Sequence, residues 1–177
     1  TEMLGGQDDL VLNYHLMHPG GERAPGDPNL AYCLDGVFHL HYILRHPWQG
    51  GTSYSFIHIN SSDMLHWRWL PTKLQPSFTG HGMFSGTGFM TKNKKPAAIY
   101  CGGGADPPYI SVANDHDLSS WGVPYPLLPK GGPAGSNITL LGDPDCFLVG
   151  DSYYAYSANF KIDRSNASTP SSVSKIQ

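Results

Sequence analysis

A short sequence unit occurs twice in this chain, and it limits the folds that the chain can adopt. Residues 26–29 read Gly-Asp-Pro-Asn and are followed by 30–42, while residues 142–145 read Gly-Asp-Pro-Asp and are followed by 146–158. In both copies an Asp precedes a Pro, a short apolar stretch follows, then an Asp/Gly turn, then alternating aromatic residues. This pattern predicts one β-hairpin unit used twice, with an Asp at the start of each first strand.

The abundance of turn-forming residues also favours short strands over helices. The 177 residues include 21 Gly and 15 Pro, and 12% are aromatic, so few windows are long enough for a helix. We expect a hairpin of 30–33 and 37–44 across Asp35-Gly36, and the chain should be turn-rich at 45–51. Further strands are expected at 54–59, 96–101 and 109–113.

The repeated features recur at nearly equal spacing. Phe84 lies 57 residues after Asp27, and Asp143 lies 59 residues after Phe84. Two turns that begin with Asp63 and Asp117 end at Trp67 and Trp121, and we expect these turns to bury their Trp residues and Leu65 in the core. A repeat of this length with about four strands is typical of the blades of a β-propeller.

The chain length corresponds to about three such blades, whereas propellers close with roughly four to eight. The predicted fold class is therefore all-β, a β-propeller of which this chain supplies a part. We expect residues 1–160 to form a partial propeller domain of catalytic type. Residues 161–177 are rich in Ser, Thr and Asn and should form a flexible end or an inter-blade loop.

The innermost strands of a propeller converge on its axis, which predicts a shared pocket. Asp27, the segment 84–86 (Phe-Ser-Gly) and Asp143 occupy equivalent places in their blades and should line it. Two carboxylates among aromatic and hydroxyl groups suit hydrolysis of a glycosidic bond, in which one attacks the anomeric carbon. Each Asp-Pro could instead be only a turn former, and 84–86 could serve only tight strand packing.

Other classes of function find little support in the sequence. The net charge of −3 and the 14% of charged residues provide no basic stripe for nucleic acid. No apolar run approaches the roughly 18 residues that a membrane-spanning helix needs. The nine His residues match no zinc motif, so neither a metal nor another cofactor is expected. Three glycosylation sequons, at Asn60, Asn137 and Asn166, are compatible with a secreted or extracytoplasmic location.

Five segments in order resemble glycoside hydrolase family 32, which contains the invertases and fructan hydrolases. They are residues 27–29 (Asp-Pro-Asn), 38–42 (Phe-His-Leu-His-Tyr), 58–67, 84–86 and 143–144 (Asp-Pro), and together the resemblance covers about 14–158. It implies a five-bladed β-propeller with about three blades in this chain, and retaining cleavage of fructosyl or related bonds in a sucrose-like or oligosaccharide substrate.

The same resemblance implies roles for individual residues. Asp27 would be the nucleophile and Asp143 the transition-state stabiliser that holds the fructosyl hydroxyls. The substrate-binding residues would be Asn29, His58, Phe84 and Ser85.

The chain also departs from the family pattern. Gly26 replaces an Asn, Ile43 a Gln and Gly142 an Arg. The general acid of the family, a Glu about 50 residues after the second Asp, would fall beyond residue 177, and the only glutamates, Glu2 and Glu22, are upstream. We therefore expect this chain to lack the group that protonates the leaving oxygen.

Two alternatives follow from these departures. The chain could be a non-catalytic, carbohydrate-binding propeller relative, or a five-bladed glycosidase of another specificity, such as arabinan cleavage. A three-blade portion would leave blade faces uncovered, so self-association through them is also expected.

Overall fold

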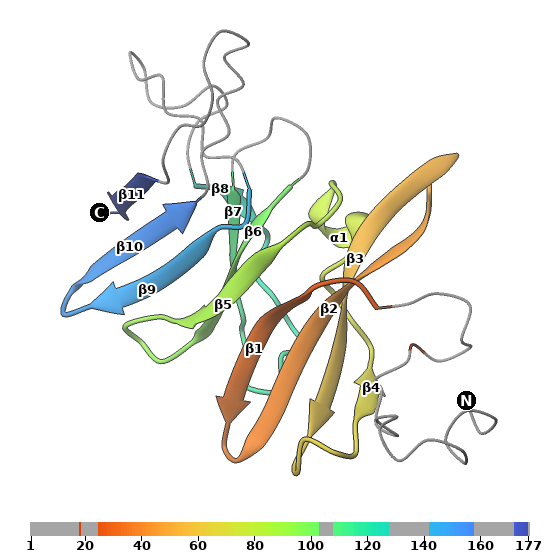
Figure 1. Ribbon diagram of the computed structural model, residues 1–177, viewed down its shortest axis with the longest axis horizontal. Coiled ribbons are helices and arrows are strands. Elements are labelled where there is room, and N and C mark those ends of the chain that lie inside the picture. Colours follow the sequence, from red (N-terminus) through yellow and green to blue (C-terminus); the bar gives the residue numbers. More distant parts are fainter. Residues whose placement is uncertain (1–17, 19–24, 103–107, 128–141, 158–171, 177) are drawn as a thin grey trace, which may run out of the picture.

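The computed structural model describes residues 18, 25–102, 108–127, 142–157 and 172–176 of the chain. These residues form eleven β-strands and one short helix, arranged in three antiparallel sheets (Figure 1). The all-β class predicted from the sequence is confirmed. In the part of the chain that the structure describes, no helix is long and apolar enough to cross a membrane.

The first sheet is a four-stranded meander. Its strands follow the order β1 (Pro28–Leu34), β2 (Val37–Trp48), β3 (Gly51–Ser61) and β4 (Arg68–Leu70). The β1–β2 hairpin turns at Asp35-Gly36 as predicted, and both turn residues have positive φ. The turn-rich segment predicted at 45–51 is wrong, because β2 and β3 pair continuously to Trp48 and Gly51 around a second two-residue turn.

Two further meanders follow. Helix α1 (Pro76–Thr79) lies between the first sheet and the second, whose strands are β5 (Gly86–Met90), β6 (Pro96–Cys101), β7 (Pro108–Val112) and β8 (Tyr125–Pro126). The third sheet contains β9 (Asp145–Val149), β10 (Ser152–Ser157) and β11 (Ser172–Ile176). Strand β11 pairs with β10, which differs from the flexible end or loop predicted at 161–177. The remainder of that segment, residues 161–171 and 177, lies outside the described residues.

The three sheets pack on one another through two apolar cores. The core between the first and second sheets includes Tyr32, Phe56 and Tyr100, and the Tyr32 hydroxyl donates a hydrogen bond to the carbonyl of Ala97 (2.7 Å). The core between the second and third sheets is smaller and includes Ile99. The first strands of the three sheets, β1, β5 and β9, lie side by side, as Figure 1 shows.

The two Trp-terminated turns differ in burial. Trp121 is buried in the core between the first and second sheets, as predicted. The burial predicted for Leu65 is wrong, because its side chain is 60% exposed, and Trp67 is only partly buried. The Asp63 carboxylate accepts hydrogen bonds from the backbone N–H groups of Leu65 and His66, which confirms its role as a turn former. These bonds hold the turn on the surface.

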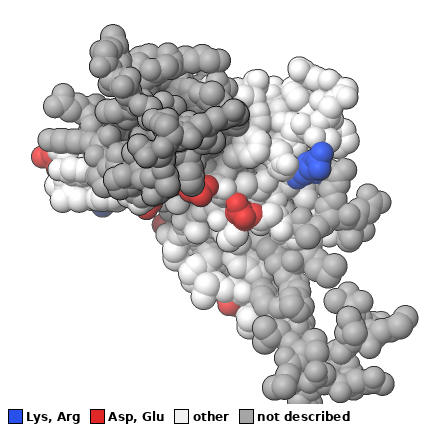
Figure 2. Space-filling view, turned by 45° about the horizontal axis from the view of Figure 1, so that its top comes forward, with Lys and Arg blue, Asp and Glu red and all other residues white. Residues whose placement is uncertain are grey.

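Charged groups are sparse on the described surface. Figure 2 shows a few scattered acidic and basic groups on a face that is otherwise uncharged where the structure describes it. The described part of that face therefore presents no basic stripe of the kind that binds nucleic acid.

Candidate functional site

The centre of the candidate site is a hydrogen bond between two residues that are far apart in the sequence. The Ser85 hydroxyl donates to Oδ2 of Asp27 at 2.8 Å. Asp27 immediately precedes β1 and Ser85 immediately precedes β5, so the start of each sheet contributes one member of the pair. The Asp27 carboxylate is exposed, which leaves it accessible to a ligand.

Asn29 fixes the backbone at Asp27. Its Nδ2 donates to the carbonyl of Asp27 (2.7 Å), and its Oδ1 accepts from the backbone N–H of Gly86 (2.9 Å). The side chain is only 9% exposed. The geometry therefore gives Asn29 a positioning role, joining β1 to β5; the predicted contact of Asn29 with substrate stays a prediction.

Close approach of β5 to β6 explains the glycine after Ser85. A Cβ atom at Gly86 would lie 2.1 Å from the carbonyl oxygen of Ile99 and 2.6 Å from Cα of Tyr100. Only a residue without a side chain fits there, which confirms the close backbone approach predicted from this glycine-rich run. On the other side of β5, the backbone N–H of Gly86 bonds to Asn29 of β1.

Phe84 forms an aromatic pair that the sequence did not reveal. Its ring lies 4.7 Å from that of Tyr54, a residue of β3, with the planes inclined by 49°. The backbone N–H of Phe84 donates to the carbonyl of Cys101 (2.9 Å), which fixes the segment beside the end of β6. Tyr54 was expected only as a strand residue, and no local pattern distinguishes it from the other aromatic residues.

Asp143 lies in the second copy of the repeated unit, in the turn before β9, and is exposed. The following Pro144 and Asp145 are tied to β5, because the Thr87 hydroxyl donates to Oδ1 of Asp145 (2.7 Å) and approaches the Pro144 carbonyl (3.4 Å). Burial raises the pKa of the Cys101 thiol above its ordinary value, the backbone N–H of Gly142 opposes this effect, and the Asp143 carboxylate adds to it. Asp27 and Asp143 thus lie near β5 and its neighbour β6.

His58 does not fit its predicted role as a substrate contact. It is 1% exposed, and its ring stacks on that of His41 with the centroids 4.4 Å apart. Its Nε2 lies 2.9 Å from Nδ1 of His39, and burial lowers the pKa of His58 to about 4. A neutral imidazole packed against other rings belongs to the buried interior.

The three stacked histidines also bear on metal binding. Among the described residues, no group of three or more His, Cys, Asp or Glu side chains is arranged to hold a metal ion. Stacked imidazole rings do not converge their nitrogens on one point, as a zinc site requires.

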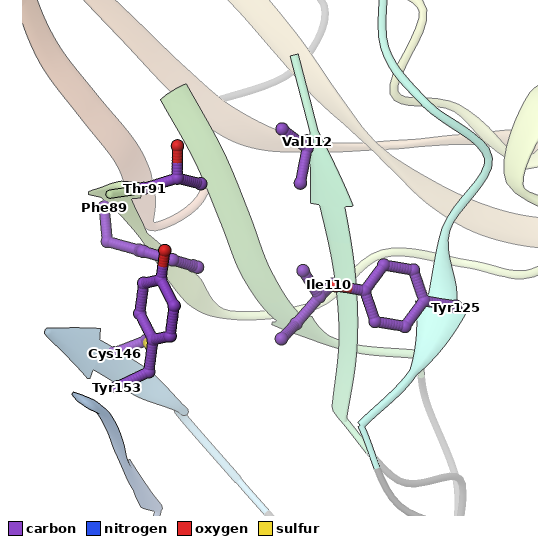
Figure 3. Close-up of a pocket in the computed structure, with 7 residues that line it drawn as sticks. All are labelled: Phe89, Thr91, Ile110, Val112, Tyr125, Cys146 and Tyr153. Atoms are coloured by element: carbon purple, nitrogen blue, oxygen red, sulfur yellow. The ribbon is translucent and has the colours of Figure 1, made fainter. Parts of the chain in front are cut away.

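A separate cleft has neither Asp27 nor Asp143 in its lining. It measures about 240 Å³ and opens between the second and third sheets (Figure 3), where its lining residues are Phe89, Thr91, Ile110, Val112, Tyr125, Cys146 and Tyr153. This lining contains no carboxylate and no imidazole, and burial raises the pKa of the Cys146 thiol to about 11. The cleft therefore lacks acid–base groups suited to neutral pH, and the site at Asp27 remains the better candidate.

Comparison with protein families and curated proteins gives consistent matches. The model of the glycosyl hydrolases family 32 N-terminal domain matches residues 22–124. The insoluble isoenzyme CWINV1, a beta-fructofuranosidase of Arabidopsis thaliana, is 26% identical over 149 residues, which cover 77% of this chain and 25% of that protein. A probable sucrose-6-phosphate hydrolase of Vibrio cholerae is 36% identical over 77 residues, covering 41% of this chain and 13% of that protein. The chain thus spans a quarter or less of these two relatives.

Solved structures show the same likeness at the level of the fold. The Bombyx mori GH32 beta-fructofuranosidase BmSUC1 aligns with a TM-score of 0.57 at 24% identity, over 77% of this chain and 30% of that one. Fructan 1-exohydrolase IIa from Cichorium intybus aligns with a TM-score of 0.54 at 22% identity, over 75% of this chain and 27% of that one. The three-sheet arrangement therefore recurs in part of larger proteins.

Proposed function

This chain belongs to glycosyl hydrolase family 32, and from that premise we propose that its Asp27 site binds a fructosyl unit and attacks it as the nucleophile of a retaining glycosidase. The main support is the hydrogen bond from Ser85 to Oδ2 of Asp27, which joins the Asp-Pro-Asn and Phe-Ser-Gly segments of the sequence across two sheets. A serine hydroxyl that donates a hydrogen bond to one carboxylate oxygen holds the carboxylate in a fixed orientation and leaves the other oxygen free to react.

The architecture proposed for this function is a set of three blades of a five-bladed propeller. The side-by-side placement of β1, β5 and β9 supports it, because the first strand of each sheet is then the innermost one. In this arrangement the residues that precede the three strands face a common axis. Asp27 and Ser85 immediately precede β1 and β5, and Asp143 lies two residues before β9.

The reaction assigns a task to each group. Oδ1 of Asp27 attacks the anomeric carbon and forms an ester bond to it. The bond between the anomeric carbon and the leaving oxygen breaks, and its electron pair departs with the leaving group. The Asp143 carboxylate stabilises the positive charge on the ring and binds its hydroxyls. The Phe84–Tyr54 pair provides an apolar wall for the sugar. The glutamates of the chain, Glu2 and Glu22, precede Asp27, and we propose that this chain alone lacks the general acid.

An activated substrate tests this proposal, because a good leaving group needs no protonation. With p-nitrophenyl β-D-fructofuranoside we expect a burst of up to one equivalent of p-nitrophenolate per chain, followed by very slow turnover. Mass spectrometry of the digested chain should locate the fructosyl ester on Asp27. The Asp27→Asn variant should lose the burst and the label. Asp151→Asn, which removes a carboxylate that is 99% exposed, should keep both; a label elsewhere, or none, would refute the assignment.

A second function, non-catalytic carbohydrate binding, is favoured by one observation. Gly26 and Ile43, two of the positions that depart from the family pattern, contact each other: a Cβ at Gly26 would lie 3.2 Å from Cβ of Ile43, which is a core residue. The family pattern has an Asn and a Gln at these two positions, so apolar packing stands here in place of two amide side chains. Saturable binding of fructose with no labelling of Asp27 would support this function. Labelling by an aryl arabinofuranoside but not by the fructofuranoside would instead indicate arabinan-type specificity.

A further inference from the structure

We propose that Thr87 is a positioning residue that attaches the turn containing Asp143 to β5, and so sets the second carboxylate relative to Asp27. This inference rests on the proposed function, since it concerns the geometry of the same site. No motif of the sequence distinguishes Thr87, which is the second residue of β5.

The first step concerns the start of β5, which contacts both copies of the repeated unit. The Ser85 hydroxyl donates to Oδ2 of Asp27 at 2.8 Å, and the Thr87 hydroxyl donates to Oδ1 of Asp145 at 2.7 Å. One residue, Gly86, separates the two donors in the sequence. Because β5 lies between β1 and β9 (Figure 1), this short stretch holds the first copy on one side and the second copy on the other.

The second step concerns the path from Thr87 to the backbone of Asp143. Oδ1 of Asp145 also accepts from the backbone N–H of Cys146 (2.7 Å), so this carboxylate is held between β5 and the start of β9. The Thr87 hydroxyl also approaches the carbonyl of Pro144 (3.4 Å). A residue that precedes a proline is restricted to extended conformations. Fixing Pro144 and Asp145 therefore restricts the position from which the Asp143 carboxylate extends.

A second contact between the same two sheets provides a matched control. The Tyr153 hydroxyl, on β10, accepts from the backbone N–H of Lys92 (2.8 Å), which lies two residues beyond the end of β5. This contact is at the opposite end of β5 from Thr87. Its loss should weaken the attachment of the third sheet to the second without displacing the turn of Asp143.

The experiment compares Thr87→Val, which keeps the shape of the side chain but removes the hydroxyl, with Thr87→Ser, which retains the hydroxyl. With saturating p-nitrophenyl β-D-fructofuranoside, we expect the burst rate constant to fall roughly tenfold or more in Thr87→Val, because small misplacements of a catalytic group cost rate. Thr87→Ser should recover most of this loss, and Tyr153→Phe should keep the wild-type rate constant. A loss of folded chains alone would lower the burst amplitude and leave the rate constant unchanged. That result in Thr87→Val would overturn the inference.

A second readout does not depend on activity. Hydrogen exchange of the Cys146 amide, measured by NMR on the whole chain, should be about tenfold faster in Thr87→Val, because the carboxylate that accepts from it loses its bond to β5. Exchange should be close to wild type in Thr87→Ser. The Gly122 amide, which donates to the carbonyl of Val112 (2.8 Å), should exchange at the wild-type rate in both variants.

The outcomes separate this inference from the proposed function. Unchanged exchange at Cys146 in Thr87→Val would overturn the inference, whatever the activity, and so would an equal acceleration at Gly122, which would indicate a general loss of stability. Faster exchange at Cys146 alone, in a protein whose wild type shows no burst, would support the positioning contact. The missing burst would in that case refute the proposed nucleophilic function instead.

Discussion

The stack of three buried histidines should make the stability of this protein fall in mild acid. His39, His41 and His58 lie between the first two sheets, where the ring of His41 also approaches Trp121. Burial lowers the pKa of each of the three, most strongly for His41, and Asp117 partly opposes this effect at His39. The folded state therefore keeps these rings neutral at pH values at which the unfolded chain binds protons.

The sign and size of the effect follow from linkage. The pKa of His58 is about 4 in the folded state, against an ordinary value of 6.5. The free energy of unfolding should thus be greatest above about pH 7 and should fall as the pH drops from 6.5 toward 4. Below about pH 4, His58 is protonated in both states and contributes no further decrease. At about 1.36 kcal/mol per pKa unit, His58 alone corresponds to roughly 3 kcal/mol, and His41 adds to it in the same direction.

Urea unfolding of the whole chain between pH 4.5 and 7.5 measures this dependence. His58→Phe keeps an aromatic ring in the stack but cannot titrate, so its free energy of unfolding should depend less steeply on pH by about 1 kcal/mol per pH unit near pH 5.5. His116→Gln is the matched control, because the His116 side chain is 54% exposed and remains hydrated in the folded state. A wild-type slope in His58→Phe would refute the reasoning.

Two further predictions concern packing and association. Gly86→Ala should lower the free energy of unfolding by about 3 kcal/mol in urea titrations, because the new Cβ would overlap the Ile99 carbonyl. In the control Gly51→Ala, the atom nearest to the new Cβ lies 3.7 Å away, so the free energy of unfolding should change by less than about 0.5 kcal/mol. We also propose that the chain self-associates through the outer face of the third sheet, where Phe147 is 45% exposed. In sedimentation velocity, Phe147→Ser should weaken self-association at least tenfold. Val123→Ser, which changes a 77% exposed residue elsewhere, should leave it unchanged. A wild-type chain that is monomeric at every concentration would contradict the proposal.

Local signals in the sequence predicted the strands better than they predicted the site. The Asp35-Gly36 turn and the alternation of residues after it define the first hairpin, because both depend on neighbouring residues only. Leu65 was wrongly placed in the core, since an apolar side chain in a turn buries only if another element covers it. The bond between Ser85 and Asp27 spans 58 residues, and only the packing of two sheets produces it.

The two copies of the repeated unit differ in how each one fixes its carboxylate residue. In the first copy, the Asn29 amide both accepts from β5 and donates to the carbonyl of Asp27, so the unit fixes its own carboxylate residue. In the second copy the equivalent residue is Asp145, and its carboxylate accepts from Thr87 of β5 but has no N–H to donate back to Asp143. The unit therefore stays attached to β5 but leaves the backbone of Asp143 without that bond.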